Sequence, residues 1–264
     1  MNFEIPLITP VSLKYYNKAQ VEEKETYYRA LDIRLCLEKI CTDLLIQFIP
    51  ETKKEKWLKL SLHNKLIDTK SFMDNNIITK IINTKLVGNN GVHNGEESNI
   101  KSIDIENSIL SIHEFSLEIF VAYFKKFGFF KPDSSWVPVI FSILPPIYRV
   151  KILKKYFDYD KSPLIIDKLS MALIKNNMIT ESYDFIKYCL ENNYIDKYTY
   201  YNFIEKLNLL EHSLDKLAVS KSLTESKERF NMLIDSIPEN ERDSFSILLS
   251  LILNGETNQI NIEF

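Results

Sequence analysis

Glycine is scarce in this sequence, with five residues among 264. Outside a single stretch the chain consists mainly of helix-forming residues, and the alternation of apolar and polar residues that is typical of a half-buried strand is almost absent. No strand-like run is bounded by an Asn-Gly turn of the kind that joins two strands in a hairpin. These absences predict an all-α fold.

Cysteine is also sparse, and its pattern excludes two kinds of small scaffold. The three cysteines, Cys36, Cys41 and Cys189, are an odd number and form no Cys-x-x-Cys pair. This argues against a zinc knuckle and against a disulfide framework. We expect all three thiols to be reduced core residues of a cytosolic protein.

Neither sign of charge dominates the chain. The 33 basic and 36 acidic residues give a formal net charge of -3. The sequence therefore lacks the global positive field that drives non-specific binding to nucleic acid. Any contact with RNA is expected to be local.

Long uninterrupted apolar runs are missing too. The most apolar windows, residues 109–130 and 137–144, are either interrupted by charged side chains or too short to span a bilayer. The first ten residues contain an acid and two prolines, whereas a secretion signal needs a basic start and an unbroken apolar run. These features predict a cytoplasmic protein without a membrane segment.

Several signatures of common enzymes are absent. The sequence contains no Walker loop, no Gly-x-Ser-x-Gly elbow, no His-Glu-x-x-His helix and no Rossmann glycine fingerprint. His63, His113 and His212 are scattered without the spacing of metal ligands. We therefore expect neither a metal nor a cofactor, and no chemistry that depends on ATP, an activated serine or a nicotinamide.

Apolar residues at steps of three and four divide the first half of the chain into helices. The longest is predicted from Val21 to about Ile49, where Pro50 ends it, after an extended lead-in that reaches residue 18. Further helices are predicted over residues 54–67, 71–84 and 104–128. Together they predict an antiparallel helical bundle.

Turn formers and prolines between Lys131 and Pro138 indicate a domain junction. With 45% hydrophobic residues the chain can bury two cores, so we expect a helical bundle at residues 1–131 and a second, smaller helical domain at residues 132–264. Helix ends in the second domain are predicted from prolines at first positions, from capping side chains and from a final glycine: Pro146, Pro163, Thr180, Asp196, Ser222 and Gly255.

Three of the five glycines lie in one stretch, from Lys85 to Glu97. Glycine lets the backbone turn sharply or approach another group closely. The stretch combines glycine with asparagine and histidine, and it is the first candidate for a chemical site: Gly88, Asn89, Asn90, Gly91, His93 and Gly95.

The order of these features resembles the HEPN superfamily. A long helix with an arginine-rich and acid-rich first half precedes shorter helices, the pattern Gly88-Asn89-x-x-x-His93 and another long helix. The pattern is most similar to a branch whose hallmark is Gly-Asn-x-x-Ala-His and which is often found beside restriction and phage-defence genes. The resemblance covers roughly residues 20–130. It implies a HEPN-like bundle that forms a homodimer and binds or cleaves RNA in a prokaryotic antiviral defence or toxin system.

The ribonuclease members of the superfamily have an arginine, a polar residue, three variable positions and a histidine. By this resemblance Asn89 takes the polar position and His93 the catalytic histidine, whereas Gly88 occupies the arginine position. Metal-free RNA cleavage needs a base for the ribose hydroxyl and a cation for the phosphate. Histidine side chains ordinarily titrate near neutrality, so His93 suits the first role.

The missing cation is expected from elsewhere. Lys85 lies one helical turn upstream, Arg29 and Arg34 lie on the first long helix, and together with Asn90 they are the predicted RNA-binding residues. A residue from a dimer partner is a further source. Because Gly88 itself cannot act as the cation, the sequence leaves open whether this is an active ribonuclease.

A structural interpretation of the same residues stands beside the catalytic one. The asparagines are suited to capping helices, the glycines to close packing, and His93 to an interhelical hydrogen bond. The alternative function is then a non-catalytic interaction or sensor protein. Such a protein would dimerise through its first domain and bind a protein partner through its C-terminal domain.

Overall fold

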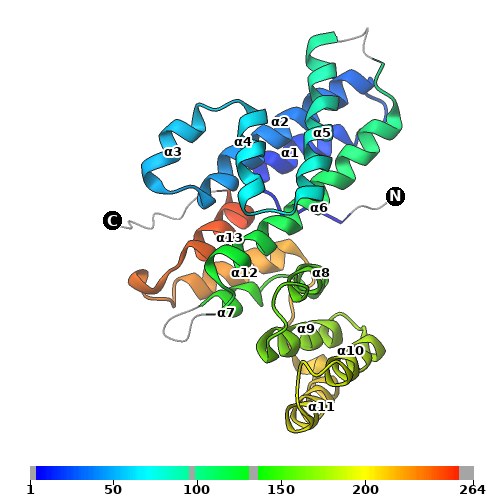
Figure 1. The fold of residues 1–264 in the computed structure, drawn as a ribbon, viewed down its shortest axis with the longest axis vertical. Helices are drawn as coiled ribbons and strands as arrows, with labels where there is room; N and C mark the ends of the chain where they lie inside the picture. The colour runs from blue at the N-terminus through cyan, green and yellow to red at the C-terminus, as the bar shows by residue number, and fades with distance from the viewer. Residues whose placement is uncertain (1–3, 95–98, 131–135, 256–264) are drawn as a thin grey trace. The chain divides into compact units, whose positions relative to one another are not determined.

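The computed structural model describes residues 4–94, 99–130 and 136–255 (Figure 1). Within these ranges every regular element is a helix, which confirms the all-α prediction. The chain divides into two compact units. The first holds the residues up to Lys126 together with the segment from Asp243 onward, and the second holds Phe127–Arg242.

The first unit surrounds a long apolar helix, α6, on which Ile112, Phe120 and Phe124 are at most 1% exposed. Helices α1 and α5 both pack against α2. The bounds of the helices are α1 Pro10–Ala19, α2 Thr26–Asp43, α3 Glu51–Leu58, α4 Leu62–Asp68, α5 Asn75–Asn94, α6 Ser102–Phe127 and α13 Ser244–Asn254.

Local capping explains two departures from the predicted helices. Residues before α2 were expected to be extended, but Thr9 accepts a hydrogen bond from the Ser12 amide at 3.3 Å and Pro10 opens α1. The single helix expected over residues 54–67 is interrupted. Ser61 accepts a hydrogen bond from the Asn64 amide at 3.3 Å and starts α4 as a separate helix.

Helix α13 belongs to the first unit, although the sequence placed it in a domain of residues 132–264. The ring of Phe245 lies 5.9 Å from that of Phe120 and 5.1 Å from that of Tyr123, both on α6. The Tyr123 hydroxyl also forms a 2.6 Å hydrogen bond with Ser244. Burial of this apolar helix against α6 thus joins it to residues that precede it by more than a hundred positions.

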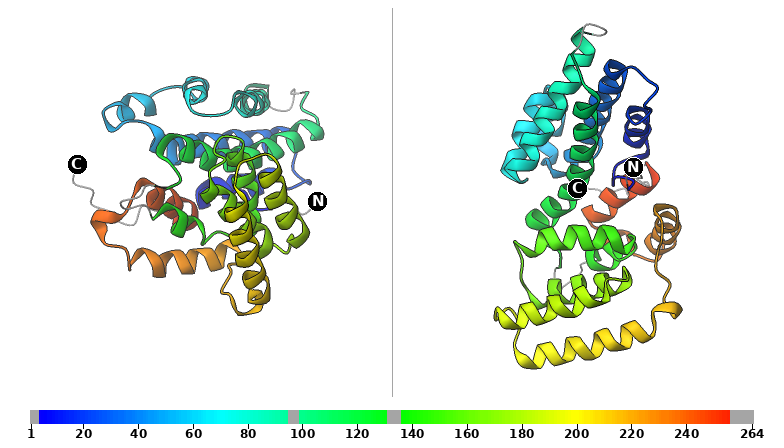
Figure 2. Two further views of the ribbon diagram at one scale, coloured as in Figure 1. Left: turned by 60° about the horizontal axis from the view of Figure 1, so that its bottom comes forward. Right: turned by 90° about the vertical axis from the view of Figure 1, so that its right-hand side faces the viewer.

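In the second unit α9 packs against α8, α10 and α11, and α10 packs against α11 (Figure 2, right). Pro146 and Pro163 open helices as predicted, and the predicted cap Asp196 accepts a hydrogen bond from the Thr199 amide at 2.7 Å. Thr180 is not a cap, because its helix begins at Ile179. The bounds are α7 Val137–Phe141, α8 Pro146–Phe157, α9 Pro163–Lys175, α10 Ile179–Glu191, α11 Lys197–His212 and α12 Leu223–Ile234.

Two asparagines end consecutive helices of the second unit in the same way. Asn177 and Asn193 have φ angles of 59° and 57°, in the left-handed region that asparagine tolerates. After each, the next amide donates to a carbonyl near the helix end, Met178 to Leu173 and Tyr194 to Cys189, both at 2.9 Å. Each asparagine is the second residue of an Asn-Asn pair, Asn176-Asn177 and Asn192-Asn193, and this likeness is explained by helix-end chemistry.

Candidate functional site

Most of the glycine-containing stretch is helical. Helix α5 extends to Asn94, whereas the sequence predicted a helix ending at residue 84 and a turn-rich segment after it. Asn89 and His93 therefore lie on a continuous helix. Gly95 and the rest of the stretch as far as residue 98 lie outside the described residues.

Gly88 and Gly91 are buried where α5 meets α2 (Figure 1). A Cβ atom on Gly88 would lie 2.8 Å from the Cβ of Arg34, and one on Gly91 would lie 2.7 Å from the carbonyl oxygen of Tyr27. Both distances are below van der Waals contact. The glycines thus allow two helices to approach closely, and an arginine at position 88 has no room in this packing.

Arg34 brings a cation to the glycine stretch from the neighbouring helix. Its Nη1 donates a hydrogen bond to the Asn89 side-chain oxygen, across the contact between α2 and α5. Its Nε donates to Glu38, one turn further along α2, at 2.9 Å. The Arg34 side chain retains 24% of its exposure, so it can still reach a ligand. A guanidinium is therefore present beside Asn89, although position 88 is a glycine.

Lys85, Asn89 and His93 follow one another at intervals of four residues on α5. Side chains four apart lie on the same face of a helix, one turn from the next. Lys85 and Asn89 are half-buried and His93 is exposed. Together with Arg34 they form a polar stripe that is open to solvent. We call these four residues the α5 stripe.

Two of the predicted site residues lie elsewhere. Arg29 is 5% exposed, and its Nε donates to the backbone carbonyl of Ala19 at 2.8 Å, so its guanidinium holds α2 to the end of α1. Asn90 is exposed but follows Asn89 directly, which turns its side chain about 100° away around the helix. Neither belongs to the α5 stripe.

Glu38 is a part of the site that the sequence prediction missed. It fixes the Arg34 side chain from a position four residues further along the same helix. The signal was available in the sequence, because an arginine and a glutamate four residues apart on a helix face commonly pair. The contact from Arg34 to Asn89 had no such signal, because 55 positions separate the two residues.

The buried thiols are poor candidates for a nucleophile. All three cysteines are free and buried, as predicted. Burial raises the pKa of Cys41 to about 12, and it also raises the pKa of Cys36. Thiolate is the reactive form of cysteine, so neither thiol reacts readily at neutral pH.

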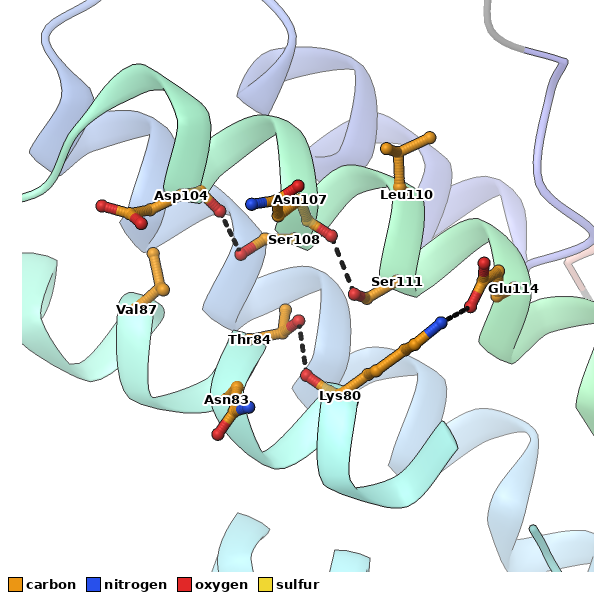
Figure 3. Close-up of a pocket in the computed structure, with 10 residues that line it drawn as sticks. All are labelled: Lys80, Asn83, Thr84, Val87, Asp104, Asn107, Ser108, Leu110, Ser111 and Glu114. Atoms are coloured by element: carbon orange, nitrogen blue, oxygen red, sulfur yellow. Dashed lines mark hydrogen bonds and ion pairs between the residues drawn. The ribbon is translucent and has the colours of Figure 1, made fainter. Parts of the chain in front are cut away.

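A second polar feature of the first unit is a groove of about 410 Å³ between α5 and α6 (Figure 3). An ion pair between Lys80 and Glu114, at 2.7 Å, crosses it. Its hydroxyls, from Thr84, Ser108 and Ser111, each donate to a carbonyl of their own helix at 2.7–3.0 Å. The three hydroxyls and Lys80 are thus already engaged within the protein, and no residue of the α5 stripe lines the groove.

Comparison with known proteins adds no assignment: no family model, curated protein or solved structure matches the chain. Within the described residues no helix is both long and apolar enough to cross a membrane. The same part of the chain contains no group of three or more His, Cys, Asp or Glu side chains arranged to hold a metal ion. The HEPN resemblance therefore rests on the motif residues and their order.

Proposed function

We propose that this chain is a HEPN-like protein that binds RNA through the α5 stripe and cleaves it in the manner of a ribonuclease, within a prokaryotic antiviral defence or toxin system. The observation that supports it best is the hydrogen bond from Arg34 to Asn89. It places a guanidinium beside the residue that resembles the polar position of the superfamily motif. In this proposal Arg34 supplies the positive charge that the motif arginine supplies in the superfamily, where this chain has Gly88.

The proposed chemistry needs no metal. His93 accepts the proton of a ribose 2′-hydroxyl, whose oxygen attacks the adjacent phosphorus while the bond from phosphorus to the 5′-oxygen breaks. The leaving 5′-oxygen takes a proton from water, and a 2′,3′-cyclic phosphate remains. Arg34 stabilises the charge on the phosphate oxygens, and Lys85 attracts the RNA backbone.

The same contacts also favour the competing, non-catalytic function. Arg34 is already engaged by Glu38 and Asn89, as in a structural link between two helices. A bundle held in this way would serve equally as a scaffold in an interaction or sensor protein. The two functions differ in whether RNA is cleaved, which is directly measurable.

The test is an incubation of the purified protein with total RNA. We expect cleavage that is lost in His93→Ala and reduced by orders of magnitude in Arg34→Gln, since each variant removes one group from the reaction. His63→Ala is the matched control, because His63 is also an exposed histidine of the first unit and lies on α4. Lys39→Gln, an exposed charge on α2, controls for lost positive charge.

The outcomes separate the functions. Cleavage by the wild type that the His63 variant retains and the His93 variant loses supports the ribonuclease. If the wild type binds RNA without cleaving it, and Arg34→Gln and Lys85→Gln weaken that binding, the protein binds RNA but is not a ribonuclease. If wild type neither binds nor cleaves RNA, the non-catalytic function stands.

A further inference from the structure

The second unit contains a cavity of about 450 Å³ that is unrelated to the α5 stripe. It lies where the first turn of α8, the end of α9 and the segment after α11 meet. We call it the α8–α9 cavity. Its lining combines apolar residues, among them two prolines and two leucines, with polar and charged ones; the residues that matter below are Pro145, Lys175, Leu217, Ser220 and Lys221.

One polar group that lines this cavity and one that lies near it are buried without a partner. Ser220 lines it and is 3% exposed, and Arg149, on the second turn of α8, is 7% exposed. Arg149 is not part of the lining, but its positive charge acts on Lys175, which is. Among the residues that the structure describes, none forms a hydrogen bond with Ser220 Oγ or with Arg149 Nε. Buried polar groups in native proteins are nearly always paired, so both call for a ligand that pairs with them.

Positive charge is concentrated at and near the α8–α9 cavity. Burial, followed by the positive charges of Arg149 and two further lysines, lowers the pKa of Lys175, and burial lowers that of Arg149 to about 10. The nearby carboxylate of Asp167 is already occupied, since both its oxygens accept from Lys206 at 2.6 and 2.8 Å. Asp167 still acts on Lys175 through its charge, but among the described residues neither Arg149 nor Lys175 forms an ion pair with a carboxylate.

We propose that the α8–α9 cavity binds a small organic phosphate, whose phosphate group pairs with Lys175 and Ser220 and is attracted by the buried charge of Arg149 beside them. A phosphate monoester carries nearly two negative charges at neutral pH and offers several acceptor oxygens, which matches two or three cations and a hydroxyl. The first turn of α8 adds a single backbone N–H, that of Ile147, because Pro145 and Pro146 have none and the amides of the next two residues donate to the Pro145 carbonyl. Lys221, at the exposed edge, is the third cation, and Asp215 is the single carboxylate in the lining.

The remaining volume indicates that the phosphate is part of a larger molecule. Sites for small organic molecules occupy roughly 300–1,000 Å³, and the cavity falls in that range at about 450 Å³. The lining includes Pro145, Leu217 and Val219, whose apolar side chains can pack against an organic group. The site lies wholly within the second unit, so its test is independent of the RNA proposal.

The experiment measures the thermal stability of the full chain and the heat of binding with inorganic phosphate, glycerol 3-phosphate and adenosine 5′-monophosphate. Ligands that bind only the folded state raise its Tm with concentration, so we expect a dose-dependent rise with the phosphates and none with adenosine. Lys175→Gln and Ser220→Ala should weaken binding by about tenfold or more, since each removes a partner of a charged ligand. Lys216→Gln is the control: Lys216 is exposed on the same segment but does not line the cavity.

Arg149→Met provides a second readout. Removing a buried charge that has no partner should raise the Tm of the ligand-free protein, while the response to phosphate is lost. If Arg149 instead stabilised the fold, its replacement by methionine would lower the Tm of the ligand-free protein. Should this variant not fold, Lys175→Gln and Ser220→Ala still decide the matter.

The relative affinities of the three phosphates decide between an organic phosphate, inorganic phosphate and no site. A higher affinity for either ester than for inorganic phosphate supports the organic ligand. Equal affinity for inorganic phosphate and both esters contradicts the proposal of an organic ligand and shows that the cavity binds the phosphate group alone. If none of the three phosphates raises the Tm at about 10 mM, no ligand binds and the site is overturned. An equal loss of phosphate affinity in Lys216→Gln and Lys175→Gln also overturns it, because the binding would then be non-specific.

Discussion

Gly88 and Gly91 set the distance between α2 and α5 at the scale of single residues. A methyl group at Gly91 would meet the Tyr27 carbonyl oxygen at 2.7 Å and the Ala30 Cβ at 2.8 Å. A backbone carbonyl cannot move aside as a flexible side chain can. The usual gain from replacing a helical glycine by alanine is therefore expected to be outweighed here.

We predict that Gly91→Ala lowers the free energy of unfolding by about 1–2 kcal/mol, because overpacking costs about 1–3 kcal/mol while better helix propensity returns at most about 1. Asn90→Ala, an exposed change on the same helix, should stay within about 0.5 kcal/mol of wild type. Urea unfolding of both variants measures the difference. A Gly91→Ala protein as stable as the wild type would show that the helices can separate without cost.

His93 is exposed on α5, which separates its chemical role from a structural one. We predict that His93→Ala changes the free energy of unfolding by less than about 1 kcal/mol, because exposed side chains away from core packing contribute little. Arg29→Ala is the contrasting change: it breaks a buried 2.8 Å hydrogen bond and should cost about 1.5–3 kcal/mol. Thermal melts compare the two. A strongly destabilised His93→Ala protein would mean that His93 serves the fold.

The packing of α13 on α6 is the element-scale feature that decides where the first unit ends. Phe245 is fully buried and contacts the rings of Phe120, Tyr123 and Phe124 at 5.1–5.9 Å. The last described helix of the chain thus completes the core begun by the first ones. A boundary near residue 131 with everything after it in one domain does not describe this arrangement.

We predict that Phe245→Ala destabilises the first unit by about 3–5 kcal/mol, the usual cost of truncating a buried phenylalanine. Met232→Ala on α12 is the control, because Met232 is 76% exposed and its truncation opens no cavity. Hydrogen exchange followed by mass spectrometry reports the two units separately. Faster exchange in α6 and α2 is expected, and an effect confined to the second unit would contradict the assignment of α13.

Assembly is the question at the scale of the whole molecule. The HEPN resemblance implies a homodimer through the first domain, with the two motif stretches facing each other. The dimer is not needed to supply a cation to the α5 stripe, because Arg34 of the same chain lies beside Asn89. A separate feature favours pairing: Leu86 and Val92, on α5, are exposed to 49% and 46%.

We predict a two-fold dimer at micromolar concentration, with Leu86 and Val92 in its contact. The double change Leu86→Glu and Val92→Glu should give a monomer, because it places charges in an apolar contact. Met232→Glu, on an exposed apolar residue of α12, should leave the dimer intact. Light scattering coupled to gel filtration measures the mass. A monomeric wild-type protein would contradict the dimer and, with it, the pairing of motif stretches.

The sequence by itself determined the features that depend on neighbouring residues. Helical periodicity and the near absence of strand patterns predicted the all-α class, and local chemistry predicted the helix starts at Pro146 and Pro163 and the cap at Asp196. In each case the residue and its partner lie within a few positions of each other, so the sequence alone shows the interaction. Gly255 ends α13 with a φ of 79° for the same reason.

Tertiary structure alone decided the meaning of Gly88 and Gly91, the partner of Asn89 and the place of α13. A glycine in a sequence is compatible with a sharp turn or with a close approach, and only the packing of α2 on α5 selects the second. Arg34 and Asn89 meet across 55 positions because two helix faces pack together, which no local pattern specifies. The unpaired Ser220 likewise becomes part of a candidate site only when folding buries it in the lining of one cavity, with Lys175 in the same lining and the charge of Arg149 nearby.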